Sequence, residues 1–355
     1  MDKLEKARAE INEIDEKILK LFEDRMKAVE DVVAFKIENN KEVFDPEREA
    51  QVIEINTQKM KNQKLISYYR DYIQSMMNIS KKYQQSIINH ETYGYPGCVG
   101  SFSHIALQNV FPQGKMISYP TFDNVFEGLS NNEIAKGVLP FENSYTGEVG
   151  EVLDLLFYYD FKIEKIYDLK IDQNLLGVEG SSLSSIKQVY SHHQAISQCQ
   201  TYLNNFDFEV VPYTNTALAA KYVSEVGDIS KAAIASIETA DIYGLKVLAK
   251  NINTSKDNTT RFAVIGKEIS GNGDHTAILF TVAHESGQLA KIMQIVAKYG
   301  FNMENIKSRS IKNASWQYYF YMEINGSYQD KKMQEMLKEC RACTQTFKII
   351  GTYNY

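Results

Sequence analysis

The feature that most constrains the fold is the run of residues 4–38, which contains neither glycine nor proline. Charged and apolar residues recur in it at alternating steps of three and four, from Arg8 through Phe22 to Lys36. This spacing places them on one face of a helix, and a helix of such length needs a coiled-coil-like partner along that face. Further helices are expected at 47–60 and 66–87. The N-terminal region is therefore predicted to be entirely helical.

From about Tyr93 the pattern changes to short apolar runs that end in Gly, Ser or Thr and give way to helical segments. Repeated strand–turn–helix units predict an α/β domain with a largely parallel sheet, in which ligands bind at the carboxyl ends of the strands. Polar residues lie at or near the starts of the helices, where free N–H groups favour an anionic ligand. These residues are Ser103, Ser191, Thr216 and Ser236.

After the loop at 270–274 the expected elements follow the order βαββαβ, which is the ferredoxin-like arrangement. Linkers are expected near 89–95 and 267–274. The chain thus reads as a multidomain protein with one α and two α/β parts. The predicted domains are 1–89, 93–268 and 274–355.

Composition excludes several classes of function. The net charge of −6 argues against general nucleic-acid binding, which requires basic surface. No apolar stretch approaches the length of a membrane span, and the N-terminus is too charged for a secretory signal. With four cysteines a disulfide framework is not expected, which fits a cytoplasmic protein.

Two further patterns carry alternative interpretations. Cys340 and Cys343 have the C-x-x-C spacing, but no second ligand pair lies nearby, so no metal site is predicted. The adjacent His192 and His193 could suggest a metal site or a hydrolase triad. No His-rich cluster supports the first, and no G-x-S-x-G motif supports the second.

Cations on an apolar helix face are the sharpest local anomaly. Arg8, Arg25 and Lys36 share one face of the first helix with Ile and Val. An unpaired buried cation costs several kcal/mol, so the three together suit a small polyanion. The alternative is that each side chain extends along a coiled-coil edge to solvent. Ser80 and Gln84, four residues apart, interrupt another apolar face and could reach into the same pocket.

Residues 4–88 resemble the all-helical chorismate mutases, whose dimers build active sites inside a helical bundle. The resemblance implies that Arg25 and Arg8, the latter from the partner chain, hold carboxylates of chorismate. It also implies that Lys36 and Gln84 donate to the ether oxygen and that Glu49 orients the substrate hydroxyl. Such a rearrangement needs the reactive conformer held and charge stabilised at the breaking bond. The implied pocket is completed by Asp45, Arg48 and Ser80.

Residues 93–267 resemble the prephenate dehydratases, through "GSFS" (100–103), "PFENS" (140–144), "SHHQAISQC" (191–199) and "NTTRF" (258–262). The resemblance implies a two-lobed fold like that of periplasmic binding proteins, with Thr260 as the catalytic residue. Loss of carbon dioxide and hydroxide leaves an aromatic ring, so a positioned Thr hydroxyl need only assist departure of the hydroxyl group. The implied substrate-binding residues are Ser101, Ser103, Glu142, Asn143, Ser144, Ser191, Arg261 and Phe262.

Two positions depart from the dehydratase pattern. His193 stands where the family has proline, and many relatives have His or Cys near Asn174. These changes bear on substrate positioning and leave open an active mutase joined to a decayed dehydratase.

The third region resembles an ACT regulatory domain, usually a phenylalanine sensor in these enzymes. The family's Gly-Ala-Leu stands here as Gly287-Gln288-Leu289, and its Glu-Ser-Arg-Pro as Lys307-Ser308-Arg309-Ser310. Gln288 is bulkier than alanine and Lys307 reverses a charge. Feedback by L-phenylalanine is therefore a hypothesis, with an effector site at Gly287, Gln288, Leu289, Ser308 and Arg309.

These resemblances predict a bifunctional chorismate mutase–prephenate dehydratase that acts on chorismate and prephenate and uses no cofactor. The mutase bundle and the ACT sheet both normally pair with copies, so a homodimer or higher even oligomer is expected. The rival hypothesis is a non-catalytic sensor of aromatic metabolites, since such folds also bind small molecules without chemistry.

Overall fold

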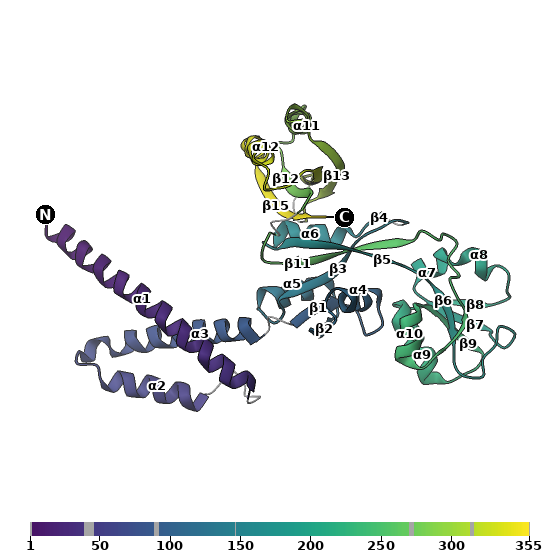
Figure 1. Ribbon diagram of the computed structural model, residues 1–355, viewed down its shortest axis with the longest axis horizontal. Helices are drawn as coiled ribbons and strands as arrows, with labels where there is room; N and C mark the ends of the chain where they lie inside the picture. Colours follow the sequence, from purple (N-terminus) through teal and green to yellow (C-terminus); the bar gives the residue numbers. More distant parts are fainter. Residues whose placement is uncertain are drawn as a thin grey trace. The chain divides into compact units, whose positions relative to one another are not determined.

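The computed structural model describes residues 2–38, 46–88, 92–145, 147–269, 273–312 and 316–354. The chain divides into two compact units, Met1–Glu91 and Thr92–Tyr355. Figure 1 follows the sequence from the helices of the first unit, in purple and blue, to the α/β elements of the second, in teal to yellow.

The described part of the first unit is helical, as its periodicity predicts. Its elements are α1 (Lys3–Glu38), α2 (Pro46–Gln58), the 3-10 turn η1 (Gln63–Leu65) and α3 (Ile66–Ile88). Val29 and Val33 of α1 and Ile73 and Met77 of α3 are buried. A long row of apolar side chains on α1 nevertheless stays exposed, including Ile11 at 55% and Leu21 at 67%. One copy of this unit therefore leaves much of its apolar helix surface uncovered.

The first lobe of the second unit is a sheet with helices around it. Its strands lie in the order β5-β11-β3-β1-β2, and β4 pairs with β3. Strand β1 is parallel to β2 and β3, whereas β11 runs antiparallel to β3 and β5. The elements are β1 (Thr92–Pro96), α4 (Phe102–Val110), β2 (Lys115–Tyr119), α5 (Phe122–Ser130), β3 (Lys136–Asn143), β4 (Gly147–Glu148), α6 (Gly150–Tyr158), β5 (Lys162–Lys170) and β11 (Thr259–Gly266).

The second lobe lies between β5 and β11 in the sequence. Its sheet has the order β10-β6-β9-β7-β8, in which β7 is parallel to β8 and β9, and β6 is antiparallel to β9 and β10. The elements are β6 (Asn174–Gly177), β7 (Gln188–Ser191), α7 (His193–Gln198), α8 (Gln200–Leu203), β8 (Glu209–Pro212), α9 (Thr216–Val226), β9 (Lys231–Ala235), α10 (Ile237–Tyr243) and β10 (Lys246–Ala249).

Two sequence-based expectations need correction. The sheets are mixed, because the chain crosses between the lobes twice and β11 returns antiparallel to its neighbours. Parallel pairs do occur within each lobe, for example β1 with β3 and β7 with β9. The linker expected at 89–95 also ends earlier than predicted, because β1 already begins at Thr92.

The C-terminal elements follow the predicted order βαββαβ and are called here the βαββαβ segment. Its sheet order β13-β14-β12-β15 continues into the first lobe through the parallel pair of Gly351 with Ile163. A Cβ on Gly351 would lie 2.4 Å from the Ile163 carbonyl oxygen, so only glycine allows this approach. The elements are β12 (His275–Thr281), α11 (Gln288–Lys298), β13 (Asn302–Ser310), β14 (Tyr318–Asn325), α12 (Lys331–Ala342) and β15 (Thr346–Tyr353).

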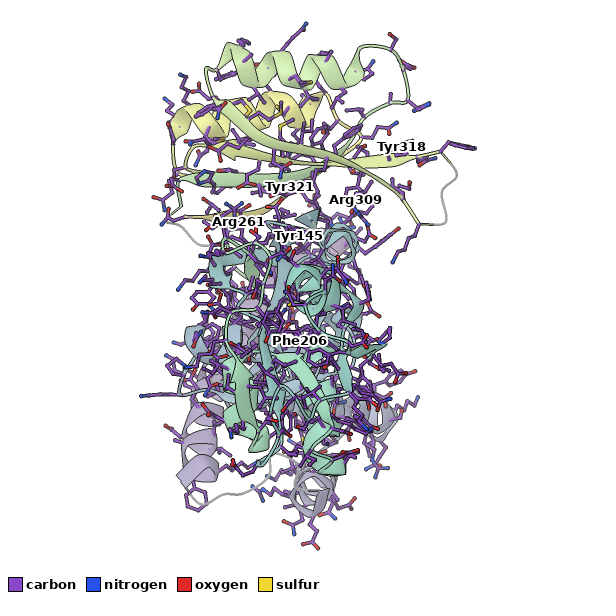
Figure 2. All side chains as sticks on the ribbon, turned by 90° about the vertical axis from the view of Figure 1, so that its right-hand side faces the viewer. Tyr145, Phe206, Arg261, Arg309, Tyr318 and Tyr321 are labelled. Atoms are coloured by element: carbon purple, nitrogen blue, oxygen red, sulfur yellow. The ribbon has the colours of Figure 1, made fainter. Side chains whose placement is uncertain are left out.

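A partly buried ion pair also joins the βαββαβ segment to the first lobe, at the junction that Figure 2 marks with Arg309. Nε and Nη2 of Arg309 donate to the two carboxylate oxygens of Asp154 at 2.8 and 3.0 Å, and the Tyr319 hydroxyl donates at 2.6 Å. Burial raises the pKa of Asp154, but the hydrogen bonds from Arg309 and Tyr319 outweigh it and the pKa is lowered. Asp154 thus stays ionised.

Replacing Asp154 by alanine is expected to lower the free energy of unfolding by about 2–3 kcal/mol, because Arg309 then remains partly buried without its carboxylate. Urea unfolding followed by circular dichroism measures the change. Asp160, 84% exposed in its pair with Lys162, is the matched control, and its alanine variant is expected to lose less than about 1 kcal/mol. Equal losses in the two variants would contradict the prediction.

The same pair gives a pH dependence. Because folding lowers the pKa of Asp154, its contribution to stability is full above about pH 5 and is lost as the pH falls through the folded value. The Asp154→Ala variant is therefore expected to lack this part of the acid-induced loss of stability.

Candidate active sites

The strongest constellation in the second unit is centred on Thr260, near the start of β11. Thr260 pairs in register with Asn143 at the end of β3, and both are buried. Nδ2 of Asn143 donates to Oγ1 of Thr260 at 2.8 Å and to Oδ1 of Asn258 at 2.9 Å. The Tyr145 amide donates to Oδ1 of Asn143 at 3.0 Å, which fixes the orientation of that side chain. Because Thr260 accepts from Asn143, its own hydrogen is available for a bound molecule.

Asn258 is a candidate site residue that the sequence predictions omitted, although it opens the "NTTRF" motif. It is 2% exposed, and its Nδ2 has no hydrogen-bond partner among the described residues. A buried donor without an acceptor costs about 1–3 kcal/mol, so its place beside Thr260 suits a ligand that supplies an acceptor. The sequence feature that could have indicated this residue is its position immediately before the buried strand β11.

The carboxyl ends of β1 and β3 lie at the same edge of the first lobe as Thr260 and Asn143. Strands β1 and β3 are parallel, so the loop 97–101 after β1 lies at the same edge as Asn143. Oγ of Ser101 accepts from the His104 amide at 3.3 Å and caps helix α4. This end of α4 presents free N–H groups and the positive end of the helix dipole.

In the second lobe, the helix starts that follow β8 and β9 contact the loop 97–101. Asn215 caps α9 after β8, and Ser236 caps α10 after β9. The Thr239 hydroxyl donates to the Gly100 carbonyl at 2.8 Å, and the Cys98 thiol donates to Oδ1 of Asn215 at 3.7 Å. Helix starts of both lobes therefore converge on residues 97–101. The predicted polar residues do lie at or near helix starts.

The other predicted dehydratase residues serve varied local roles. Oγ of Ser144 accepts from the Thr259 amide at 3.0 Å, and the buried Ser191 hydroxyl donates to the Ile234 carbonyl at 2.7 Å. Ser103 is buried in α4, and Phe262 packs in the core beside Tyr95. Nη1 of Arg261 donates to Glu142 at 3.3 Å.

In the helical unit, α1 and α3 bring four of the predicted mutase residues together in two pairs. The Arg25 guanidinium donates to Ser80, and Nζ of Lys36 donates to Oε1 of Gln84 at 3.1 Å. Ser80 and Gln84 are buried, which is unusual for polar helix residues. Glu49 of α2 pairs with Lys81 at 2.9 Å. Arg8 and Arg48 are exposed in this single chain, and Asp45 lies outside the described residues.

Comparison with known proteins decides the family. The chain matches the chorismate mutase type II family model over residues 7–85 and the prephenate dehydratase model over 93–270. The bifunctional chorismate mutase/prephenate dehydratase of Aquifex aeolicus is 32% identical over 368 residues, which span 99% of this chain and 98% of that protein. The chain belongs to the bifunctional chorismate mutase/prephenate dehydratases.

Solved structures agree on the fold of the second unit. A prephenate dehydratase from Arthrobacter aurescens, in complex with L-Phe, is 25% identical with a TM-score of 0.69 and covers 74% of this chain and 90% of its own. GqqA, reported as a novel type of quorum quenching acylase, has the same identity and TM-score and covers 74% of this chain and 97% of its own.

The bifunctional enzyme thus rearranges chorismate to prephenate and converts prephenate to phenylpyruvate, in phenylalanine biosynthesis. The predicted pair of activities is confirmed. The findings favour this function over a non-catalytic sensor and over a mutase with a decayed dehydratase.

The residues predicted for an effector site of the bifunctional enzyme fall into two groups. Leu289 lines a cavity of about 680 Å³, together with Ser286 and Tyr318. Gly287, with φ +85°, precedes α11, and Gln288 donates to Glu285 at 3.3 Å. Ser308 is exposed on β13, whereas its neighbours Lys307 and Arg309 contact the first lobe through Glu142 and Asp154.

The cysteine and histidine patterns have structural explanations. Cys340 is buried, its thiol contacts the Met336 sulfur at 3.5 Å, and burial raises its pKa to about 12. Its burial and its contact with Met336 explain its place in the core of the βαββαβ segment. His192 caps α7 by accepting from the Gln194 amide at 3.4 Å, and burial lowers its pKa.

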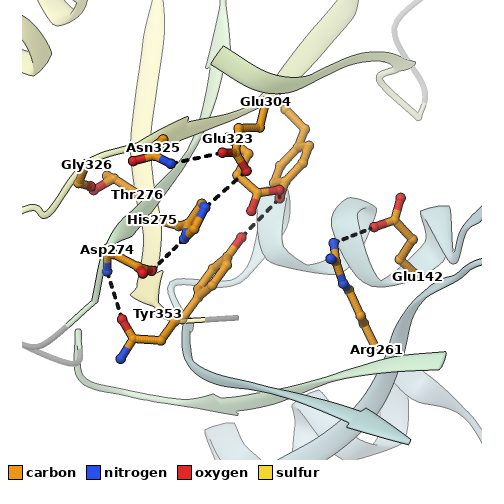
Figure 3. A network of polar contacts seen from close by, with 12 residues as sticks. Glu142, Arg261, Asp274, His275, Thr276, Glu304, Glu323, Asn325, Gly326 and Tyr353 are labelled. Atoms are coloured by element: carbon orange, nitrogen blue, oxygen red, sulfur yellow. Dashed lines mark hydrogen bonds and ion pairs between the residues drawn. The ribbon is translucent and has the colours of Figure 1, made fainter. Parts of the chain in front are cut away.

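One group in the described residues offers atoms that could hold a metal ion, namely His275, Glu304 and Glu323, within 4.8 Å of one another. Figure 3 shows that the His275 ring already contacts Asp274 at 2.6 Å and Glu304 at 3.0 Å. The buried Glu323 accepts from the Tyr321 hydroxyl at 3.1 Å. With both ring nitrogens engaged by carboxylates, the group is a polar network.

Among the helices of the described residues, none combines the length and apolarity that a membrane crossing requires.

Proposed function

We propose that prephenate binds where β3 ends and β11 begins, with Thr260 as the donor to the departing hydroxyl group. The observation that carries this is the hydrogen bond from Asn143 to Thr260, because it directs the threonine hydrogen away from the protein amide. A neutral hydroxyl is a poor acid, so fixed geometry supplies most of its effect. Aromatisation of the ring drives the loss of carbon dioxide.

The remaining groups of this site suit a dicarboxylate. Nδ2 of Asn258 offers a buried donor, and the capped helix starts after Ser101 and Asn215 offer N–H groups to anions. Ser144, Ser103, Ser191 and Phe262 keep their predicted place in the site, with Phe262 acting from the core by packing. Glu142 and Arg261 act on it from the opposite face of β3 and β11, where they pair with each other.

For the first reaction, the proposal places chorismate between α1 and α3. Arg25 holds a carboxylate, and Lys36 and Gln84 donate to the ether oxygen, where negative charge develops. Glu49 orients the hydroxyl, and Arg48, Ser80 and Asp45 complete the pocket. The substitutions Thr260→Ala and Lys36→Met test the two assignments, since each is expected to remove one step and spare the other.

Arg8 completes the mutase site from a second copy of the chain in this proposal. The support is the exposed apolar surface of α1, which a homodimer or higher even oligomer would cover. A cytoplasmic location is proposed with it, supported by four cysteines that are all free thiols.

The βαββαβ segment is proposed to be an ACT domain that binds L-phenylalanine beside Leu289. Support comes from the cavity of about 680 Å³ at the start of α11 and from the L-Phe complex of the Arthrobacter aurescens protein. The proposed domains keep the boundaries 1–89, 93–268 and 274–355, and the dehydratase lobes resemble periplasmic binding proteins in this proposal.

Calorimetric titration of L-phenylalanine into the full chain is expected to show saturable heat, with a matching change in the rate of phenylpyruvate formation. Leu289→Arg places a charged side chain in the cavity and is expected to abolish the heat. If the unaltered protein gives no heat and no rate change, the segment is structural and the effector proposal fails.

A further inference from the structure

The two faces of strand β11 separate the reaction site from the βαββαβ segment. Side chains alternate along a strand, so Thr260 and Phe262 point to one face and Arg261 and Ala263 to the other. The two hydrophobic clusters on either side of β11 support this assignment. Phe262 packs in the cluster that contains Tyr95 of β1, whereas Ala263 belongs to the cluster that includes tyrosines of β14 and β15. Arg261 therefore lies directly behind the catalytic threonine.

Strand β3, which pairs with β11, also has side chains on both faces, and a bulge in it decides which residues face the βαββαβ segment. Glu142 is in register with Arg261 and Pro140 with Phe262, so Phe141 is the extra residue. In a regular strand Phe141 and Glu142 would point to opposite faces. Here both reach the βαββαβ segment, since the Phe141 ring meets Tyr321 edge-on at 5.9 Å and Glu142 meets Lys307. The next residue, Asn143, turns back toward Thr260.

The Glu142 carboxylate forms ion pairs with two cations, Lys307 and Arg261. Nζ of Lys307 on β13 lies 3.0 Å from one carboxylate oxygen, and Nη1 of Arg261 lies 3.3 Å from the other. Asp168 takes a second contact with Arg261, at 3.7 Å. Lys307 and Glu142 are each 26% exposed, so water screens the pair only in part. Figure 3 shows Arg261 reaching Glu142 beside the polar network of the βαββαβ segment.

We propose that Lys307 is a positioning residue for the dehydration of prephenate, although it belongs to the βαββαβ segment. It fixes Glu142, and the bulged backbone of β3 then sets Asn143 against the Thr260 hydroxyl. The proposal rests on the proposed role of Thr260. It means that the segment shapes the dehydratase site by direct contact, whether or not an effector is bound.

The test compares Lys307→Met and Lys307→Arg with a matched lysine in the same segment. Lys348 of β15 also reaches the first lobe, but its Nζ donates to the carbonyls of Phe157 and Tyr159 at 2.6 and 3.2 Å, beyond the catalytic strands. Lys348→Met therefore measures what a lost contact between the same parts does by itself. Each variant is made in the full chain and assayed with added prephenate.

We expect kcat for prephenate to fall about tenfold in Lys307→Met with KM changed less than twofold, because a small displacement of a catalytic group suffices for such a loss. Lys307→Arg is expected to keep most of the rate, and Lys348→Met to keep nearly all of it. In the Glu142→Gln background, Lys307→Met is expected to add little, since the two act through one contact.

Unchanged kcat in Lys307→Met, or an equal fall in Lys307→Met and Lys348→Met, overturns the proposal. Should Lys307→Met fail to fold, Lys307→Ala, which also removes the donor, takes its place with the same two outcomes. The role proposed for Thr260 is tested separately. If that role is wrong, Thr260→Ala keeps its dehydratase rate, regardless of the result for the Lys307 variants.

Discussion

Replacing Thr260 by alanine is expected to lower kcat for prephenate by about 10²–10⁴-fold, the range for loss of a positioned proton donor. The change removes the hydroxyl that accepts from Asn143 and leaves the buried strand otherwise intact. The rate of prephenate formation from chorismate is expected to stay unchanged, because the mutase residues lie in a separate compact unit. Steady-state rates with each substrate measure both effects.

Thr259 provides the control, since it is the neighbouring threonine and points to the other face of β11. Thr259→Ala is expected to keep most of the activity, and Thr260→Ser, which retains the hydroxyl, to keep more than Thr260→Ala. Similar losses in the two alanine variants would show that the strand, rather than the Thr260 hydroxyl, had been disturbed.

Replacing Lys36 by methionine is expected to lower kcat for chorismate by about 10²–10³-fold, because the ether oxygen loses the cation that stabilises its developing charge. Methionine keeps much of the side-chain volume, so α1 and α3 can still pack. Conversion of added prephenate to phenylpyruvate is expected to continue at the unaltered rate. Both rates are measured on one purified sample.

Lys27 is the matched control on the same helix. It is exposed and lies away from the face that carries Arg25 and Lys36, so Lys27→Met is expected to change the chorismate rate less than twofold. A chorismate rate in Lys36→Met close to that of Lys27→Met would remove Lys36 from the mutase site.

Periodicity was sufficient to predict the helices and the order of the later elements. The run 4–38 emerges as α1 (Lys3–Glu38) because nothing in it interrupts a helix, and α3 follows its apolar spacing equally well. Periodicity carries no information on strand direction. The antiparallel return of β11 depends on where the chain crosses between lobes, so the sheet was predicted as too parallel.

The contacts of the candidate site residues could not be predicted from the sequence. Thr260 and Asn143 are 117 residues apart and meet only because β3 and β11 pair. Asn258 was overlooked because it becomes a candidate only through its burial beside that pair. Lys307 was predicted as a changed effector residue, whereas its Nζ contacts Glu142 of the first lobe. The bulge at Phe141 that permits this contact has no simple sequence signal.

The most direct test of two separate sites on one chain is a time course with chorismate as the only substrate, with prephenate and phenylpyruvate quantified together by NMR. The unaltered protein is expected to form phenylpyruvate, Thr260→Ala to stop at prephenate, and Lys36→Met to leave chorismate unused. Phenylpyruvate formed by Thr260→Ala at the unaltered rate would contradict the account, because the second reaction would then take place without the group assigned to it.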